Sequence, residues 1–153
     1  MAILKDYTEQ PTCEVELNIE SVNDVSVKFN ICFRSGHSFP AVQSTILCLK
    51  EDFLEMLRDL KQLNNTYLTM LEHKDPGLCI YHIPQFGTYY FPNYGILVPE
   101  KESDLRYKLI FVLDAGEMNL RRATECGPAL CLIARMEQIN EFANSLIAQV
   151  NNV

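Results

Sequence analysis

CEVELNIE, residues 13–20, alternates apolar and polar side chains without a break. A period of two over eight residues is typical of a β-strand with one buried face. Residues 25–33, VSVKFNICF, repeat the alternation, and a short link at 21–24 joins the two stretches. The sequence therefore predicts an antiparallel hairpin here. With Ile19 opposite Val25, Glu16 would face Lys28, an opposite-charge pair that favours this register.

The rest of the chain continues as strands, interrupted by two segments with helical periodicity. Residues 50–63 and 136–151 each place their apolar side chains on one helical face, as amphipathic helices do. Strands joined by short turns build an antiparallel sheet, and two such helices can cover one of its faces. We therefore predict an α+β fold, a single antiparallel β-sheet with two amphipathic helices packed on one face. The strands are expected at 13–20, 25–33, 39–49, 66–73, 78–83, 105–114 and 129–134; residues 66–73 also fit an extension of the preceding helix.

Length and composition indicate one domain. The chain has 153 residues, 48% apolar and 22% charged, which is typical of a globular domain with one core. We expect residues 1–153 to form a single α+β domain, with residues 1–12 as a flexible N-terminal segment. No basic stretch leads into an apolar signal sequence, and no run reaches the roughly 18 apolar residues of a membrane span. A cytoplasmic protein with no membrane partner is the expectation.

The charge balance excludes one class of partner and favours another. Thirteen basic and twenty acidic residues give a net charge of −7. Such a chain lacks the excess of lysine and arginine that neutralises phosphates, so we expect no nucleic-acid binding. An acidic surface can instead steer association with a basic protein. Strand alternation places Glu14 and Glu16 on the wet face, which makes them candidate binding residues.

Candidate catalytic residues follow no local motif. The six cysteines include no Cys-x-x-Cys pair, and the three histidines lack metal-ligand spacing, so we predict no metal and no cofactor. Cys126, in a polar stretch, is the candidate reactive thiol. An enzyme would need Cys126 or Cys79 as nucleophile and His82 or His37 as base, brought together by the fold.

Tyrosine is concentrated in FGTYYFPNYG, residues 86–95. This stretch holds five of the fifteen aromatic residues of the chain. A tyrosine ring contributes a large contact area while its hydroxyl stays hydrated, which suits a binding surface. We predict a recognition role for Tyr89, Tyr90 and Tyr94.

Two strand–helix units carry a resemblance to a known family. In the first, ILCL at 46–49 runs into EDFLEMLRDL at 51–60; in the second, LCLIA at 130–134 runs into QINEFANSLI at 138–147. In element order, residues 13–150 resemble the WapI-type immunity proteins, small acidic cytosolic proteins of bacteria that neutralise contact-dependent toxins. The usual tryptophans of that family are absent and its Gly-rich turns are sparse here, so the resemblance implies a fold but transfers neither the partner nor any site residue.

These observations favour a non-catalytic protein-binding module of a bacterial type, which masks or escorts another protein as an immunity protein or adaptor does. One alternative is a cysteine/histidine-dependent enzyme with no local motif. Another is an acidic secretion chaperone, although such chaperones usually begin with a helix and this chain begins with strands. A homodimer with the tyrosines in its interface also fits the sequence.

Overall fold

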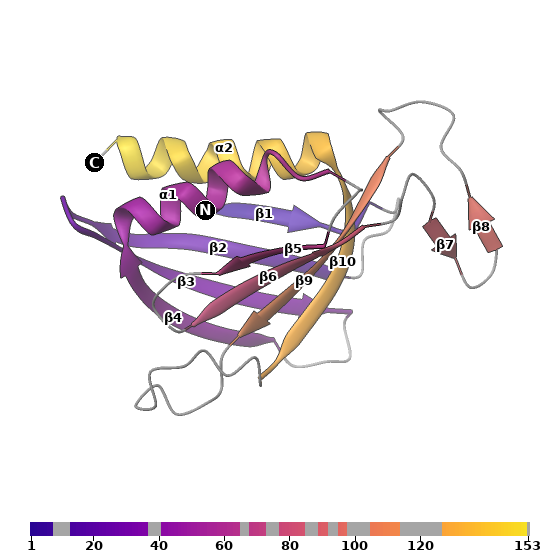
Figure 1. The fold of residues 1–153 in the computed structure, drawn as a ribbon. Helices are drawn as coiled ribbons and strands as arrows, with labels where there is room; N and C mark the ends of the chain where they lie inside the picture. The colour runs from indigo at the N-terminus through magenta and orange to yellow at the C-terminus, as the bar shows by residue number, and fades with distance from the viewer. Residues whose placement is uncertain are drawn as a thin grey trace.

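A computed structural model (Figure 1) shows strands and two helices in the order ββββα followed by six strands and a helix. It describes residues 1–7, 13–36, 41–64, 68–72, 77–84, 89–91, 95–97, 105–113 and 127–152. The elements are β1 (Ala2–Lys5), β2 (Cys13–Val22), β3 (Ser26–Ser35), β4 (Val42–Leu49), α1 (Lys50–Leu60), β5 (Thr69–Glu72), β6 (Leu78–Ile83), β7 (Tyr89–Phe91), β8 (Gly95–Leu97), β9 (Arg106–Leu113), β10 (Ala129–Arg135) and α2 (Met136–Asn151).

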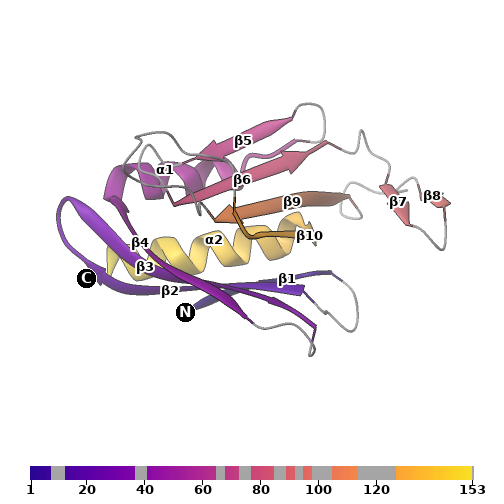
Figure 2. The same ribbon diagram turned by 90° about the horizontal axis from the view of Figure 1, so that it is seen from below.

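The strands form two four-stranded antiparallel sheets, so the predicted single sheet is wrong, whereas the α+β class and the antiparallel pairing are confirmed. Sheet A has the order β1-β2-β3-β4 and sheet B the order β10-β9-β6-β5, while β7 and β8 pair with each other in a separate two-stranded sheet among the described strands. The two sheets face each other (Figure 2). Phe33 of sheet A meets Phe111 of sheet B edge to face, with ring centroids 6.4 Å apart. Sheet B therefore covers apolar surface of sheet A that the prediction assigned to the helices.

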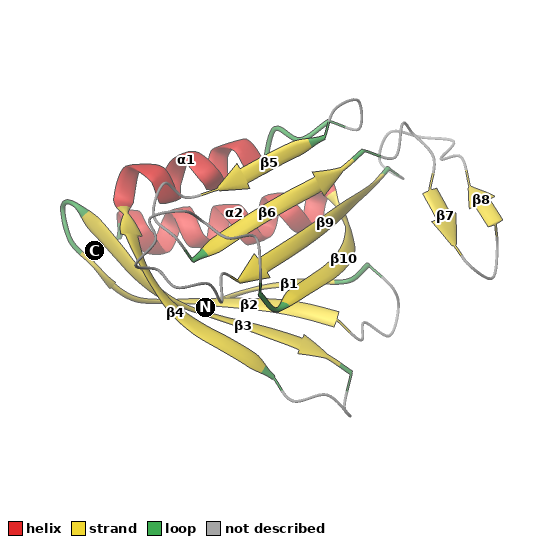
Figure 3. Ribbon diagram, turned by 60° about the horizontal axis from the view of Figure 1, so that its bottom comes forward, coloured by secondary structure: helices red, strands yellow, loops and turns green. Residues whose placement is uncertain are grey.

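The helices lie along one side of both sheets instead of on one face of one sheet (Figure 3). Helix α1 lies against β3, β4 and β5, and α2 lies against β1, β2, β10 and α1. Both helices bury an apolar stripe, as their periodicity predicts. The buried helix residues are Phe53, Met56, Leu57 and Leu60 in α1 and Ile139, Phe142, Ala143, Leu146 and Val150 in α2.

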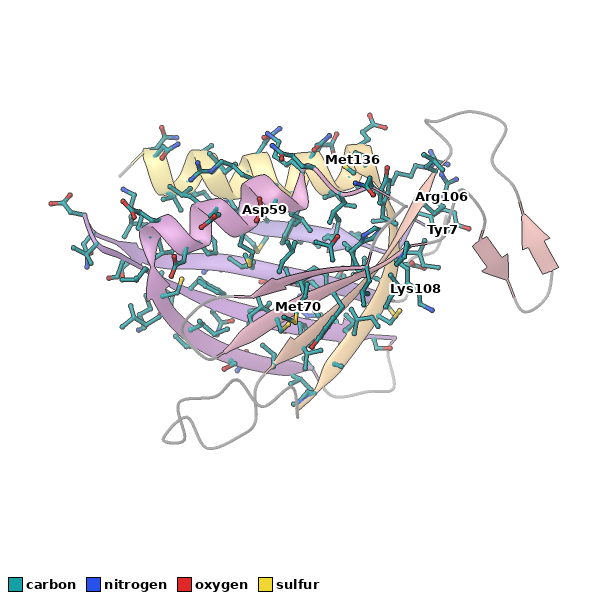
Figure 4. All side chains as sticks on the ribbon, in the orientation of Figure 1. Tyr7, Asp59, Met70, Arg106, Lys108 and Met136 are labelled. Carbon is teal, nitrogen blue, oxygen red and sulfur yellow. The ribbon has the colours of Figure 1, made fainter. Side chains whose placement is uncertain are left out.

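The N-terminal segment joins the two sheets. Residues 2–5, within the segment predicted to be flexible, form the edge strand β1 of sheet A; residues 8–12 lie outside the described residues. Beyond β1, Tyr7 N–H donates to Ile133 O of β10 at 2.9 Å, and Ile133 N–H donates to Asp6 Oδ1 at 2.9 Å. Arg106 Cζ lies 4.4 Å from the ring centroid of Tyr7 (Figure 4), a cation–π contact at the same corner.

The β2–β3 hairpin is present, but its predicted register is wrong. Ile19 pairs with Phe29, four residues beyond the expected Val25, and Glu16 pairs with Cys32. The Asn23 side chain fixes the turn, because its Oδ1 accepts from the N–H groups of Val25 and Ser26 at 2.9 and 2.7 Å. A shift of four residues leaves every side chain on its face, so alternation alone could not detect it.

Candidate functional site

The outer face of sheet A, which points away from sheet B and the helices, is the candidate functional surface (Figure 2). Along β4 the buried and exposed residues alternate, so Ile46 and Cys48 enter the core while their neighbours face outward. In the part of the chain that the structure describes, no helix or strand is packed over this outer face.

One end of the outer face carries an ion-pair cluster around Arg34. The β2–β3 register sets Glu14 opposite Arg34, and Arg34 Nη1 lies 3.2 Å from Glu14 Oε1 and also pairs with Glu16. Lys5 Nζ lies 3.9 Å from Glu14 Oε2. Hydrogen bonds from its guanidinium to Glu16 and Glu14 raise the pKa of Arg34.

Ion pairs with Arg34 reduce the negative charge that the predicted binding residues Glu14 and Glu16 offer to a partner. Glu14 and Glu16 lie on the outer face, where alternation placed them, but each carboxylate is paired with a cation. Sequence reasoning paired Glu16 with Lys28 and missed Arg34; Lys28 pairs with Glu20 instead, at 2.8 Å. The described pairs neutralise negative charge at this end of the face, so Glu14 and Glu16 offer less attraction to a basic partner than their number suggests.

The other end of the outer face is apolar. Leu47 and Leu49 of β4 are 62% and 44% exposed, and we call these two residues the outer apolar patch. Both face outward because they alternate with the buried Ile46 and Cys48. Leu49 pairs with Ser26, the first residue of β3, beside the β2–β3 turn in which Val25 is 66% exposed. Exposed apolar side chains gathered on one face mark interaction sites more often than scattered ones do.

Sequence reasoning missed the outer apolar patch, although one signal was available. Residues 46–49 are apolar without interruption, so both faces of β4 carry apolar side chains at this end. The core covers only one face of this edge strand. An uninterrupted apolar run therefore leaves the apolar side chains on its other face exposed.

The predicted tyrosine site is only partly within the described residues. Tyr89 and Tyr90 lie in β7, where they pair with Leu97 and Ile96 of β8. Tyr94 lies outside the described residues, as does the candidate thiol Cys126. The tyrosines are therefore not placed in the outer face of sheet A, and their recognition role stays a prediction.

One predicted catalytic pair is wrong. Cys79 and His82 are three residues apart in β6, so their side chains leave opposite faces of sheet B. Both are buried, Cys79 opposite Val112 and His82 opposite Leu109. The other two residues of that hypothesis, Cys126 and His37, lie outside the described residues.

Cys131 of β10 is the exposed free cysteine among the described residues, and its thiol is not activated. Desolvation of its sulfur raises the pKa of the thiol, and a raised pKa lowers the thiolate fraction. Among the described residues, no group of three or more His, Cys, Asp or Glu side chains is arranged to hold a metal ion.

Burial of His82 predicts a pH-dependent stability. His82 is fully buried, its ring centroid is 5.7 Å from that of Tyr107, and desolvation lowers the pKa of the imidazole below its ordinary 6.5. Below pH 6.5 the unfolded chain therefore binds a proton that the folded chain does not. The free energy of unfolding should then fall as the pH drops below 6.5, by up to about 1.4 kcal/mol per pH unit.

Urea unfolding between pH 7.5 and 5 measures this slope, with His82→Gln as the control. The difference between wild type and the variant isolates His82 from all other titrating groups. Identical slopes in the two proteins would show that His82 is protonated equally easily in the folded and unfolded chains.

No protein-family model, curated protein or solved structure matches this chain. Neither described helix has the length and apolar character needed to cross a membrane.

Proposed function

We propose that this protein is a non-catalytic protein-binding module that masks or escorts another protein through the outer face of sheet A. The outer apolar patch is the observation that carries the proposal. Its two side chains lie on one uncovered face, where fully burying an exposed leucine contributes up to about 1.5–3 kcal/mol before the entropic costs of association. The ion pairs around Arg34 form a polar border at the far end, a common arrangement at protein interfaces.

The net charge supports the kind of partner. A net charge of −7 favours encounter with a basic protein. In an immunity-like role, like that of the WapI-type proteins, the partner would be a toxin that this chain masks. In either role the patch provides apolar contact, whereas the long-range charge accelerates association.

Leu47→Asp should weaken partner binding at least about tenfold, because it places a charge where the partner buries an apolar side chain. A photo-crosslinking residue at position 47 identifies the partner in cells that make this protein. Titration of the purified partner against wild type and variant then gives the affinity.

Leu68→Asp is the matched control, since Leu68 is 63% exposed, nearly the same as Leu47, but lies just before β5 in sheet B. The control should bind as the wild type does. Equal affinities for wild type and Leu47→Asp would contradict the proposal, and loss of a dimer as the only effect of Leu47→Asp would assign the patch to self-association.

A further inference from the structure

Strand β1 leaves part of its backbone without a partner, as its hydrogen-bond directions show. Alternate residues of a strand direct their N–H and C=O groups to opposite sides. Asp6 N–H donates to Cys13 O at 3.0 Å, so the even-numbered residues, Ala2 and Leu4 among them, face β2. The odd-numbered residues therefore face the outer edge of sheet A.

Two hydrogen bonds on the outer side confirm this direction and limit the free edge. Tyr7 N–H donates to Ile133 O at 2.9 Å, and Lys5 O accepts from Gln138 Nε2 at 3.2 Å. Three outward-facing backbone groups of β1 lie before these two bonds and make no hydrogen bond to any described residue. They are the Ile3 N–H, the Ile3 C=O and the Lys5 N–H. Three backbone groups at one edge are what an added strand pairs with.

A groove of about 360 Å³ lies beside this edge, between β1 and α2. Ala2, Ile3 and Lys5 line one side, and Glu141, Phe142 and Ser145 line the other. Peptide-binding domains that extend a sheet commonly hold the added strand beside a helix in the same way.

The charges of the groove select its occupant. Lys5 faces Glu14 of the neighbouring strand at 3.9 Å, whereas Glu141 forms no ion pair with any described residue. Helix α2 carries Glu137 and Glu141 in its sequence and no lysine or arginine. The Met1 ammonium, which donates to Gln149 Oε1 at 2.8 Å, also lines the groove, so Glu141 is the one carboxylate among its described lining residues and the point at which a basic side chain finds its complement.

We propose that the groove between β1 and α2 binds an extended, basic segment of a partner protein, which pairs with Ile3 and Lys5 and sets a lysine or arginine against Glu141. This site is separate from the outer apolar patch, since β1 and β4 are opposite edges of sheet A. It accepts a strand through backbone groups, whereas the patch accepts apolar side chains.

Two synthetic peptides test the proposal by NMR titration of the full chain. One is the acetylated and amidated heptapeptide Thr-Val-Thr-Lys-Val-Thr-Val, and the other has Glu in place of Lys. The lysine peptide should bind about three- to tenfold more tightly. It should shift the Ile3 and Lys5 amides and slow their hydrogen exchange, while the Leu4 amide, already directed at β2, stays unchanged.

Variants of Glu141 separate charge recognition from strand pairing. Glu141→Gln should remove most of the preference for the lysine peptide, and Glu141→Lys should reverse it. Glu137→Gln is the control, because Glu137 lies one turn earlier on α2 and does not line the groove; its preference should equal that of the wild type.

Three results would overturn the proposal. They are equal affinity for the two peptides, peptide-induced shifts at β4 in place of β1, and a preference that Glu141→Lys leaves unchanged. Leu47→Asp should bind the lysine peptide as the wild type does, so a failure of this site and a failure of the outer apolar patch are distinguishable.

Discussion

Phe111→Ala should lower the free energy of unfolding by about 3–5 kcal/mol. Phe111 is buried in the middle of β9, and its ring meets Phe33 of sheet A at an interplanar angle of 73°. Truncation leaves a cavity at the contact between the two sheets, where neither sheet can close the gap without moving relative to the other. Urea unfolding followed by circular dichroism measures the change.

A neighbour in the same strand provides the control for Phe111. Ile110 is adjacent but faces the outer side of sheet B and is only partly buried, so Ile110→Ala should cost about 1 kcal/mol. A double-mutant cycle of Phe33→Leu with Phe111→Leu should give a coupling of about 0.5–1.5 kcal/mol. Zero coupling, with equal costs for Phe111→Ala and Ile110→Ala, would contradict the packing of one sheet on the other.

Phe53→Ala should have a similar effect, about 3–5 kcal/mol, by detaching α1 from sheet A. Phe53 is fully buried on α1, and its ring centroid lies 5.1 Å from that of Phe29 in β3. The same unfolding experiment measures this loss.

Leu54 is the matched position for Phe53, because it is adjacent on α1 and only partly buried. Leu54→Ala should therefore cost clearly less than Phe53→Ala. If the two substitutions had the same effect, α1 would not be anchored through Phe53.

Local periodicity predicted the elements whose pattern depends only on neighbouring residues. Helix α2 spans 136–151 and β6 spans 78–83, as predicted, while α1 ends at Leu60, three residues before the predicted end. Strand alternation also placed Val15 and Leu17 in the core and Glu14 and Glu16 outside it.

The division into two sheets could not be read from the same pattern. A strand with one buried face has the same alternation whether a helix or a second sheet covers that face. The contact of Phe33 with Phe111 joins residues 78 positions apart, and no local signal specifies such a pairing. Strand β1 was missed because four residues are too few to establish a period of two.

The ion-pair cluster around Arg34 and the groove beside β1 depend on contacts between distant parts of the chain even more than the two-sheet arrangement does. Arg34 reaches Glu14 and Glu16 only in the register that the Asn23 turn sets. The groove beside β1 exists because α2, at the other end of the chain, lies along the edge of sheet A. Neither feature follows from spacing within a single segment.

Side-chain footprinting with and without the crosslinked partner tests most directly whether the outer face of sheet A is a binding surface. Hydroxyl-radical labelling reports the solvent exposure of individual apolar side chains. We expect the partner to protect Leu47 and Leu49, while Leu68 and Met70 of the sheet B side stay as reactive as in the free protein. Protection of Leu68 and Met70, with Leu47 and Leu49 still fully labelled, would contradict this expectation.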